Sequence, residues 1–122
     1  MITDLYAVEG GAVTGLNFVS TEQFRQANPL TFAAVVAAFD EAIDWVNADK
    51  PRAAQFYLDA TKEKIALEDL TKILMAPDYI FGKTPHRVGA AIEIMHTAGI
   101  LKSKPQSWKE MYFPEAHVLP GD

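Results

Sequence analysis

The stretch that decides the fold runs from Asn28 to Asn47 and reads NPLTFAAVVAAFDEAIDWVN. Asn28 is a typical helix cap, and Pro29 suits the first turn of a helix, where its missing N–H costs nothing. Alanines broaden the apolar side of this stretch. We therefore expect a long helix over residues 29–47 that packs on more than one side. Its inward-facing stripe has the three- and four-residue spacing of one helical face and consists of Phe32, Val35, Val36, Phe39, Ile43 and Val46.

Composition places the chain among globular proteins. Of its 122 residues, 49% are hydrophobic and 22% are charged, enough for one domain with a core. The net charge of −5 and the scattered lysines and arginines argue against a nucleic-acid surface. The absence of cysteine excludes disulfides and thiolate chemistry. The opening MITDLYAVEGG lacks the basic start of a signal peptide, so the residues alone predict a cytoplasmic protein.

Caps and prolines mark the other helices. Ser20 with Gln23 has the spacing of a capping box, and Thr84-Pro85 combines a cap with a first-turn proline. Gly99 is a typical left-handed end residue, and Ser107 with Glu110 has capping-box spacing. We expect further helices over residues 21–27, 48–61, 66–75, 84–96 and 108–112.

Extended segments are few. Ile2–Val8 and Val13–Ser20 are β-leaning and are separated by Glu9-Gly10-Gly11-Ala12, and Asp78–Gly82 is a third short piece. The sequence thus predicts five or six helices with two or three short strands. By segment, residues 1–20 are expected to be extended, residues 21–113 helical and residues 114–122 an irregular tail.

Two sets of polar residues are candidates for a catalytic or metal-binding site. Asp40 and Asp44 lie four residues apart on one helical face, a spacing that suits acid–base catalysis or a metal, although a solvated acidic face is the more common role. His86, His96 and His117 are far apart in the sequence, so we expect no shared metal site.

Two further features could line a binding site. The aromatic residues Trp45, Trp108, Tyr112 and Phe113 could line a pocket, but packing is the more common role of such residues. The bend over Glu9–Gly15 could present main-chain N–H groups to an anion, or it could be a plain turn. No catalytic residue is predicted.

Two runs carry a family resemblance. The first contains a glycine pair and an extended segment, then F-R-x-x-N-P before an alanine-rich helix that ends in N-A-D-K. These features are Gly10-Gly11, Val13–Val19, Phe24-Arg25, Asn28-Pro29 and Asn47–Lys50. The second, MHTAGILKSKPQSWKEMYFPEAH from Met95, fits M-H-x-x-G-x-(I/L)-K-x-K-P-x-S-W-K-(D/E) followed by F-P-E-x-H. Together they resemble the later part of periplasmic solute-binding proteins of ABC importers, of the nitrate/sulfonate/taurine type that includes thiamine-pyrimidine precursor binders.

The resemblance implies an α/β fold of two lobes that closes on a small solute, with this chain as its helix-rich C-terminal segment over residues 1–122. It also implies a periplasmic location, delivery to ABC permease membrane subunits, and neither enzymatic activity, cofactor nor metal. The implied ligand-binding residues are Glu9, Gly10, Gly11 and Thr14. Such a segment is expected to bind solute weakly by itself and to self-associate.

Two alternatives remain open. One is a stand-alone helical interaction module whose apolar stripes form a homodimer. The other is an enzyme of thiamine-pyrimidine synthesis, against which the lack of a cysteine- and histidine-rich site counts.

Overall fold

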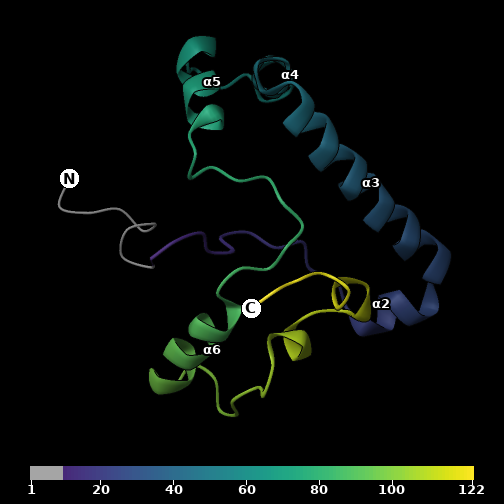
Figure 1. Ribbon diagram of the computed structural model, residues 1–122. Coiled ribbons are helices and arrows are strands. Elements are labelled where there is room, and N and C mark those ends of the chain that lie inside the picture. Colours follow the sequence, from purple (N-terminus) through teal and green to yellow (C-terminus); the bar gives the residue numbers. More distant parts are fainter. Residues whose placement is uncertain (1–9) are drawn as a thin grey trace. The chain divides into compact units, whose positions relative to one another are not determined.

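A computed structural model describes residues 10–122 of the chain, which divide into two compact units (Figure 1). The helical unit, Phe18–Gly82, contains α2 (Glu22–Ala27), α3 (Pro29–Ala48), α4 (Lys50–Thr61) and α5 (Leu67–Met75). The discontinuous unit combines residues 10–17 with Lys83–Asp122. Its elements are α6 (Val88–Thr97) and the 3₁₀ helices η1 (Trp108–Met111) and η2 (Pro114–Ala116).

The expectation of an α/β fold with two or three strands is wrong for residues 10–122, which contain no strand. Among the described residues, 13–20 have no continuous main-chain partner. Thr14 N–H donates to the carbonyl of His86 at 3.1 Å, but His86 N–H donates to the Thr14 side-chain oxygen. In a β-ladder the His86 N–H would donate to a main-chain carbonyl, but here its acceptor is a side-chain hydroxyl. The expected strand Ile2–Val8 lies outside the described residues.

The caps of the helical unit are partly those predicted. Asp49 accepts an N–H from the first turn of α4 at 3.0 Å, as expected. Asn28 was expected to cap α3 but instead closes α2, because its side-chain amide donates to the carbonyl of Phe24. The cap of α2 is Thr21, one residue after the predicted Ser20. The helices themselves lie where the apolar spacing predicts them.

In the discontinuous unit, α6 begins at Val88 rather than near Thr84. Residues 84–86 are not helical, and Arg87 adopts a left-handed φ of +55°. The predicted left-handed Gly99 is confirmed, with φ +74°. The predicted capping box of Ser107 and Glu110 is also confirmed at η1.

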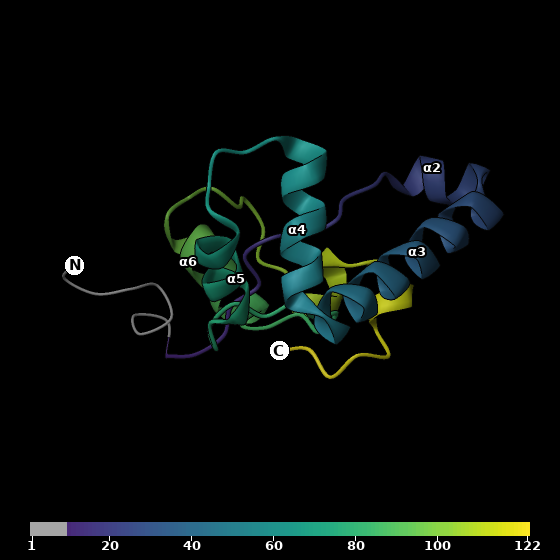
Figure 2. The same ribbon diagram turned by 90° about the horizontal axis from the view of Figure 1, so that it is seen from above.

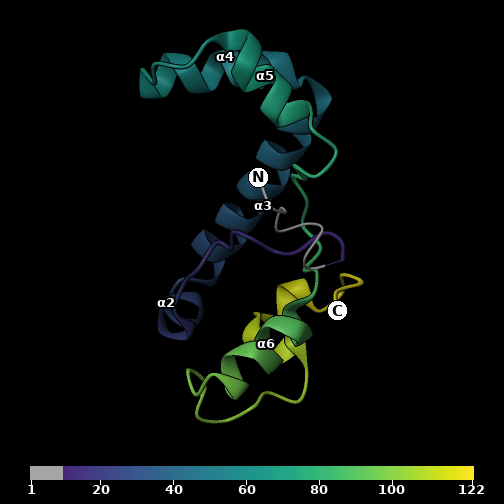
Figure 3. The same ribbon diagram turned by 90° about the vertical axis from the view of Figure 1, so that its left-hand side faces the viewer.

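The helical unit has a thin core. Helix α3 connects α2 to α4 (Figure 2), and α4 packs beside α5 (Figure 3). The predicted multi-sided packing of α3 is wrong: Phe32 is its only buried residue, and Phe39 is 44% exposed. In α4 the buried residues are Ala53 and Ala54, whose small side chains permit close helix approach. Of the other stripe residues of α3, Phe39 is exposed and Val35, Val36, Ile43 and Val46 are half-buried.

Exposed apolar side chains are numerous across the described residues. Leu30, at the start of α3, is 86% exposed, and Met75, at the end of α5, is 61% exposed. Large apolar side chains that are exposed in such numbers on one chain suggest an interface with another chain. This surface generates the first prediction.

We predict that the purified chain self-associates, with a mass above the 13.5 kDa of one copy by size-exclusion chromatography with light scattering. Leu30→Glu should shift the equilibrium towards monomer, because it replaces an exposed apolar side chain with a charged one. Thr31→Glu adds the same charge at the neighbouring exposed residue and serves as the control. A clean monomer at high concentration in the unaltered chain contradicts the prediction.

A second prediction concerns the end of α4. Lys62 has a left-handed φ of +58°, and its N–H donates to the carbonyl of Leu58. Because glycine adopts this conformation without steric cost, Lys62→Gly should stabilise the chain by about 0.5–1 kcal/mol. Lys64→Gly is the matched control, since Lys64 has no positive φ and glycine there should be neutral or destabilising. Equal changes in urea midpoint for the two variants would refute the explanation.

Candidate functional site

The candidate site is centred on Thr14, which the structure joins to His86. Thr14 N–H donates to the His86 carbonyl at 3.1 Å, and His86 N–H donates to the Thr14 hydroxyl oxygen at 2.7 Å. Both residues are half-buried. The predicted ligand residue Thr14 therefore already serves as a structural clasp between segments that are 72 residues apart.

A second clasp lies three residues further along the same segment. The Tyr112 hydroxyl donates to the side-chain oxygen of Asn17 at 2.8 Å. Burial of the phenol raises the pKa of Tyr112 above its ordinary value. The segment 10–17 is thus attached to the rest of its unit at two polar points.

The glycine pair has the backbone geometry that the sequence suggested. Gly10 has φ +72° and Gly11 has φ +146°, conformations that other residues rarely adopt. A Cβ atom at Gly10 would lie 3.9 Å from Nη1 of Arg87, so the guanidinium lies beside the Gly10 main chain. The fourth predicted ligand residue, Glu9, lies outside the described residues.

The start of α6 is covered by Asp122. Arg87 N–H donates to Oδ1 of Asp122 at 2.9 Å, and Val88 N–H donates to its main-chain oxygen at 2.8 Å. Because Asp and Asn are favoured helix caps and N-terminal N–H groups attract negative charge, Asp122 acts as a cap from a distant part of the sequence. Sequence spacing could not reveal it, since a local cap was expected at Thr84.

The residues of the M-H…S-W-K run are engaged with one another. His117 Nε2 lies 2.8 Å from the Lys109 carbonyl and 3.0 Å from the Tyr112 carbonyl, at the end of η1. Trp108 packs edge-on against Tyr112, with ring centroids 5.7 Å apart. A Cβ at Gly121 would lie 2.8 Å from the Trp108 ring, so glycine is required there. These aromatic residues pack against each other rather than line a pocket.

An ion pair closes the loop after α6. Lys104 Nζ hydrogen-bonds to a carboxylate oxygen of Glu93. This contact lowers the pKa of Glu93 below its ordinary value. Lys104 belongs to the K-P part of the run, so this residue too is explained by a local contact.

The other candidate residues do not form a site. Asp40 is half-buried and Asp44 is exposed, and no group of three or more potential metal ligands occurs among residues 10–122. Trp45 packs edge-on against Phe56, with ring centroids 5.5 Å apart. It belongs to the helical unit, whereas Trp108 belongs to the discontinuous unit.

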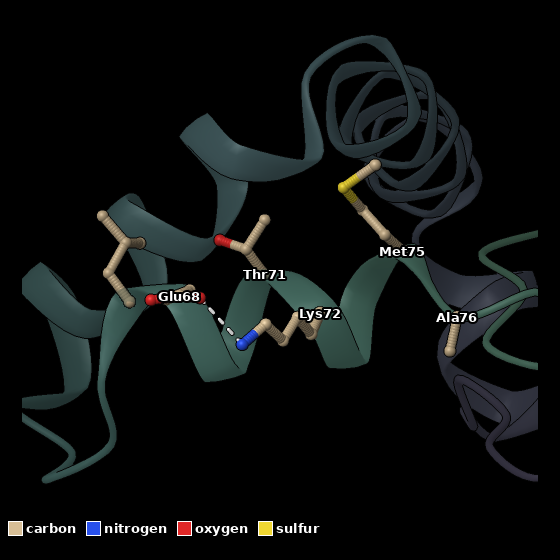
Figure 4. Close-up of a pocket in the computed structure, with 6 residues that line it drawn as sticks. Glu68, Thr71, Lys72, Met75 and Ala76 are labelled. Atoms are coloured by element: carbon tan, nitrogen blue, oxygen red, sulfur yellow. Dashed lines mark ion pairs between the residues drawn. The ribbon is translucent and has the colours of Figure 1, made fainter.

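An open depression lies along α5 in the helical unit (Figure 4). Thr71 and Met75 point to the same side of the helix, and Lys72 pairs with Glu68 at 2.8 Å. The lining is mainly apolar and holds no pair of groups suited to acid–base chemistry. Its six lining residues are Leu67, Glu68, Thr71, Lys72, Met75 and Ala76.

The comparisons with known proteins add no relative. No family model matches the sequence, and neither a curated protein nor a solved structure matches it significantly. Among the described residues, no helix is both long enough and apolar enough to cross a membrane.

The Thr14 clasp generates a stability prediction. Thr14→Val keeps the branched shape but leaves the half-buried His86 N–H without its acceptor, so we expect a loss of about 1–3 kcal/mol in unfolding free energy. Thr14→Ser retains the oxygen and should lose much less. Urea denaturation followed by tryptophan fluorescence measures both. If the two variants are equally destabilised, the hydroxyl is not the important group.

Tyr112 generates a pH prediction. Because its pKa is raised in the folded state, the folded chain holds this proton more tightly than the unfolded chain. Its contribution is complete below the ordinary pKa of about 10 and is lost as pH rises through the folded-state value. Thermal melts between pH 8 and 11 should therefore show a steeper alkaline loss for the unaltered chain than for Tyr112→Phe. Tyr79→Phe, at an exposed tyrosine, is the control.

Proposed function

We propose that this chain acts in solute capture for an ABC importer of the nitrate/sulfonate/taurine type, as part of a larger binding protein. The support is the run from Met95 to His117, in which many positions follow the pattern of that class. The proposed role consists of binding and release, with no covalent step. A periplasmic location and delivery to permease membrane subunits belong to the same proposal.

One structural observation carries the proposal furthest. Polar residues of this run hydrogen-bond to other parts of the same run. For example, His117 contacts the main-chain carbonyls of Lys109 and Tyr112. Such mutual contacts stabilise the fold of the unit that contains the run. We therefore assign this run a structural role in the binding protein and place the ligand contacts in other segments.

Gly10 and Gly11 are the favoured contacts for the solute. Successive main-chain N–H groups in a turn can form a concavity that attracts anions, and Gly10 and Gly11 lie in a turn followed by a bend. The guanidinium of Arg87 lies beside Gly10. An anionic solute such as nitrate or a sulfonate therefore suits this segment better than a neutral one.

The exposed apolar surface supports the proposal that further protein is needed. Leu30 and Phe56, at 86% and 65% exposed, are typical of surfaces that pack against other protein. The same observation favours the second candidate function, a helical interaction module that forms homodimers. The two differ in one respect: only the first expects solute at Gly10–Thr14.

The test is a titration of the ¹⁵N-labelled chain with nitrate, taurine or an aminopyrimidine, followed by amide chemical shifts. We expect shifts at Gly10, Gly11 and Thr14, with a weak dissociation constant of about 1 mM or above, which corresponds to a binding free energy of about −4 kcal/mol or weaker. Sodium chloride at equal ionic strength is the control for non-specific salt effects.

Two outcomes would count against parts of the proposal. If none of the solutes shifts these amides at tens of millimolar, while the chain forms a stable dimer, the interaction module is the better function. Micromolar binding by the chain alone would support solute capture but contradict the need for further protein.

A further inference from the structure

The segment Leu119–Asp122 crosses the start of α6, and its contacts extend beyond a simple helix cap. Besides receiving the N–H groups of Arg87 and Val88, Asp122 directs its own N–H at the carbonyl of Pro85, 3.4 Å away. Contacts of Asp122 thus fall on both sides of His86 in the sequence. We call Leu119–Asp122 the strap.

The residues under the strap are the same ones that hold the candidate ligand segment. His86 uses its N–H and carbonyl for Thr14, whereas the Pro85 carbonyl accepts from Asp122 and the Arg87 N–H donates to it. The short run from Pro85 to Arg87 is therefore bound on one side by the ligand segment and on the other by the strap. Any movement of this run on release of Asp122 passes directly to Thr14.

Arg87 makes this run sensitive to the strap. Its φ of +55° lies in the left-handed region, which a residue with a Cβ adopts only when its surroundings enforce it. The bond from its N–H to Asp122 Oδ1 is one of those enforcing contacts. Without that bond, Arg87 can return to an ordinary conformation, and its side chain would leave its place beside Gly10.

The strap itself is held lightly. None of its residues is fully buried: Asp122 and Pro120 are exposed, whereas Leu119 and Gly121, which fits closely against Trp108, are half-buried. Segments with few buried contacts open locally at low cost.

We propose that the strap is a releasable latch: seated, it fixes Gly10–Thr14 in the observed conformation, and released, it frees that segment to rearrange. That Gly10–Thr14 binds solute rests on the proposed function, whereas the latch itself concerns conformation alone. The test therefore uses no ligand, and its failure would leave the solute titration unaffected.

Amide hydrogen exchange of the full chain by NMR is the test. Asp122→Ala removes the side-chain acceptor, and Gly121→Ala forces a Cβ against the Trp108 ring. Each should speed exchange at Arg87 and Val88, and also at Thr14 and His86, by about fivefold to tenfold. Asp122→Asn keeps an acceptor oxygen and should have a smaller effect. Asp78→Ala removes an exposed aspartate of the helical unit and is the matched control.

The decisive amides are those of Thr14 and His86. Acceleration there in Asp122→Ala, with the α4 amides unchanged, supports the latch. Acceleration confined to Arg87 and Val88 would overturn it, because Asp122 would then be only a local cap. No acceleration in Asp122→Ala would also overturn it. If Gly121→Ala does not fold, the comparison of Asp122→Ala with Asp122→Asn still decides between these results.

Discussion

The discontinuous unit depends on the pair of hydrogen bonds between Thr14 and His86, which join segments 72 residues apart. Closing a flexible loop of that length costs about 4 kcal/mol in chain entropy, whereas two hydrogen bonds contribute a net of about 1–3 kcal/mol. The pair therefore does not hold the unit together by its strength alone, and burial of apolar residues such as Ile92 must offset the rest. The pair fixes the alignment of residues 10–17 relative to Lys83–Asp122. Because each group has one partner at that point, residues 10–17 can lie along Lys83–Asp122 in only one alignment.

Local signals in the sequence predicted the helices well. The apolar spacing after Pro29 placed α3 within one residue, and Asp49 and Gly99 fulfilled their predicted end roles. These features depend on neighbours within one helical turn, so the sequence contains the information needed. One error came from competition between close neighbours, and the others came where a distant partner decides. Asn28 lost its predicted role because the carbonyl of Phe24 was available to its side chain, and periodicity cannot show such competition.

In the candidate site, too, some features were predictable from the local sequence and others depended on distant residues. The positive φ of Gly10 and Gly11 was foreseeable, because glycine pairs commonly mark such bends. The engagement of Thr14 by His86 was not, since nothing near either residue indicates the other. Nor did any local pattern connect Asp122 with α6. The predicted strand over residues 13–20 failed for a related reason: a threonine hydroxyl took the N–H that a neighbouring strand would have bound through its main chain.

The division of the chain into an inserted helical unit and a discontinuous unit has a consequence for synthesis. Phe18–Gly82 is complete as a sequence before Lys83 leaves the ribosome, and its contacts are between helices adjacent in the chain. Residues 10–17 are made before this unit, whereas His86 and Tyr112, their hydrogen-bond partners among the described residues, emerge after it. At ordinary elongation rates the stretch from Lys83 to Asp122 takes about 2–8 s, which is long compared with helix formation. The segment that carries the glycine pair is thus made before the helical unit and ordered after it. Throughout that interval it is accessible to chaperones and proteases.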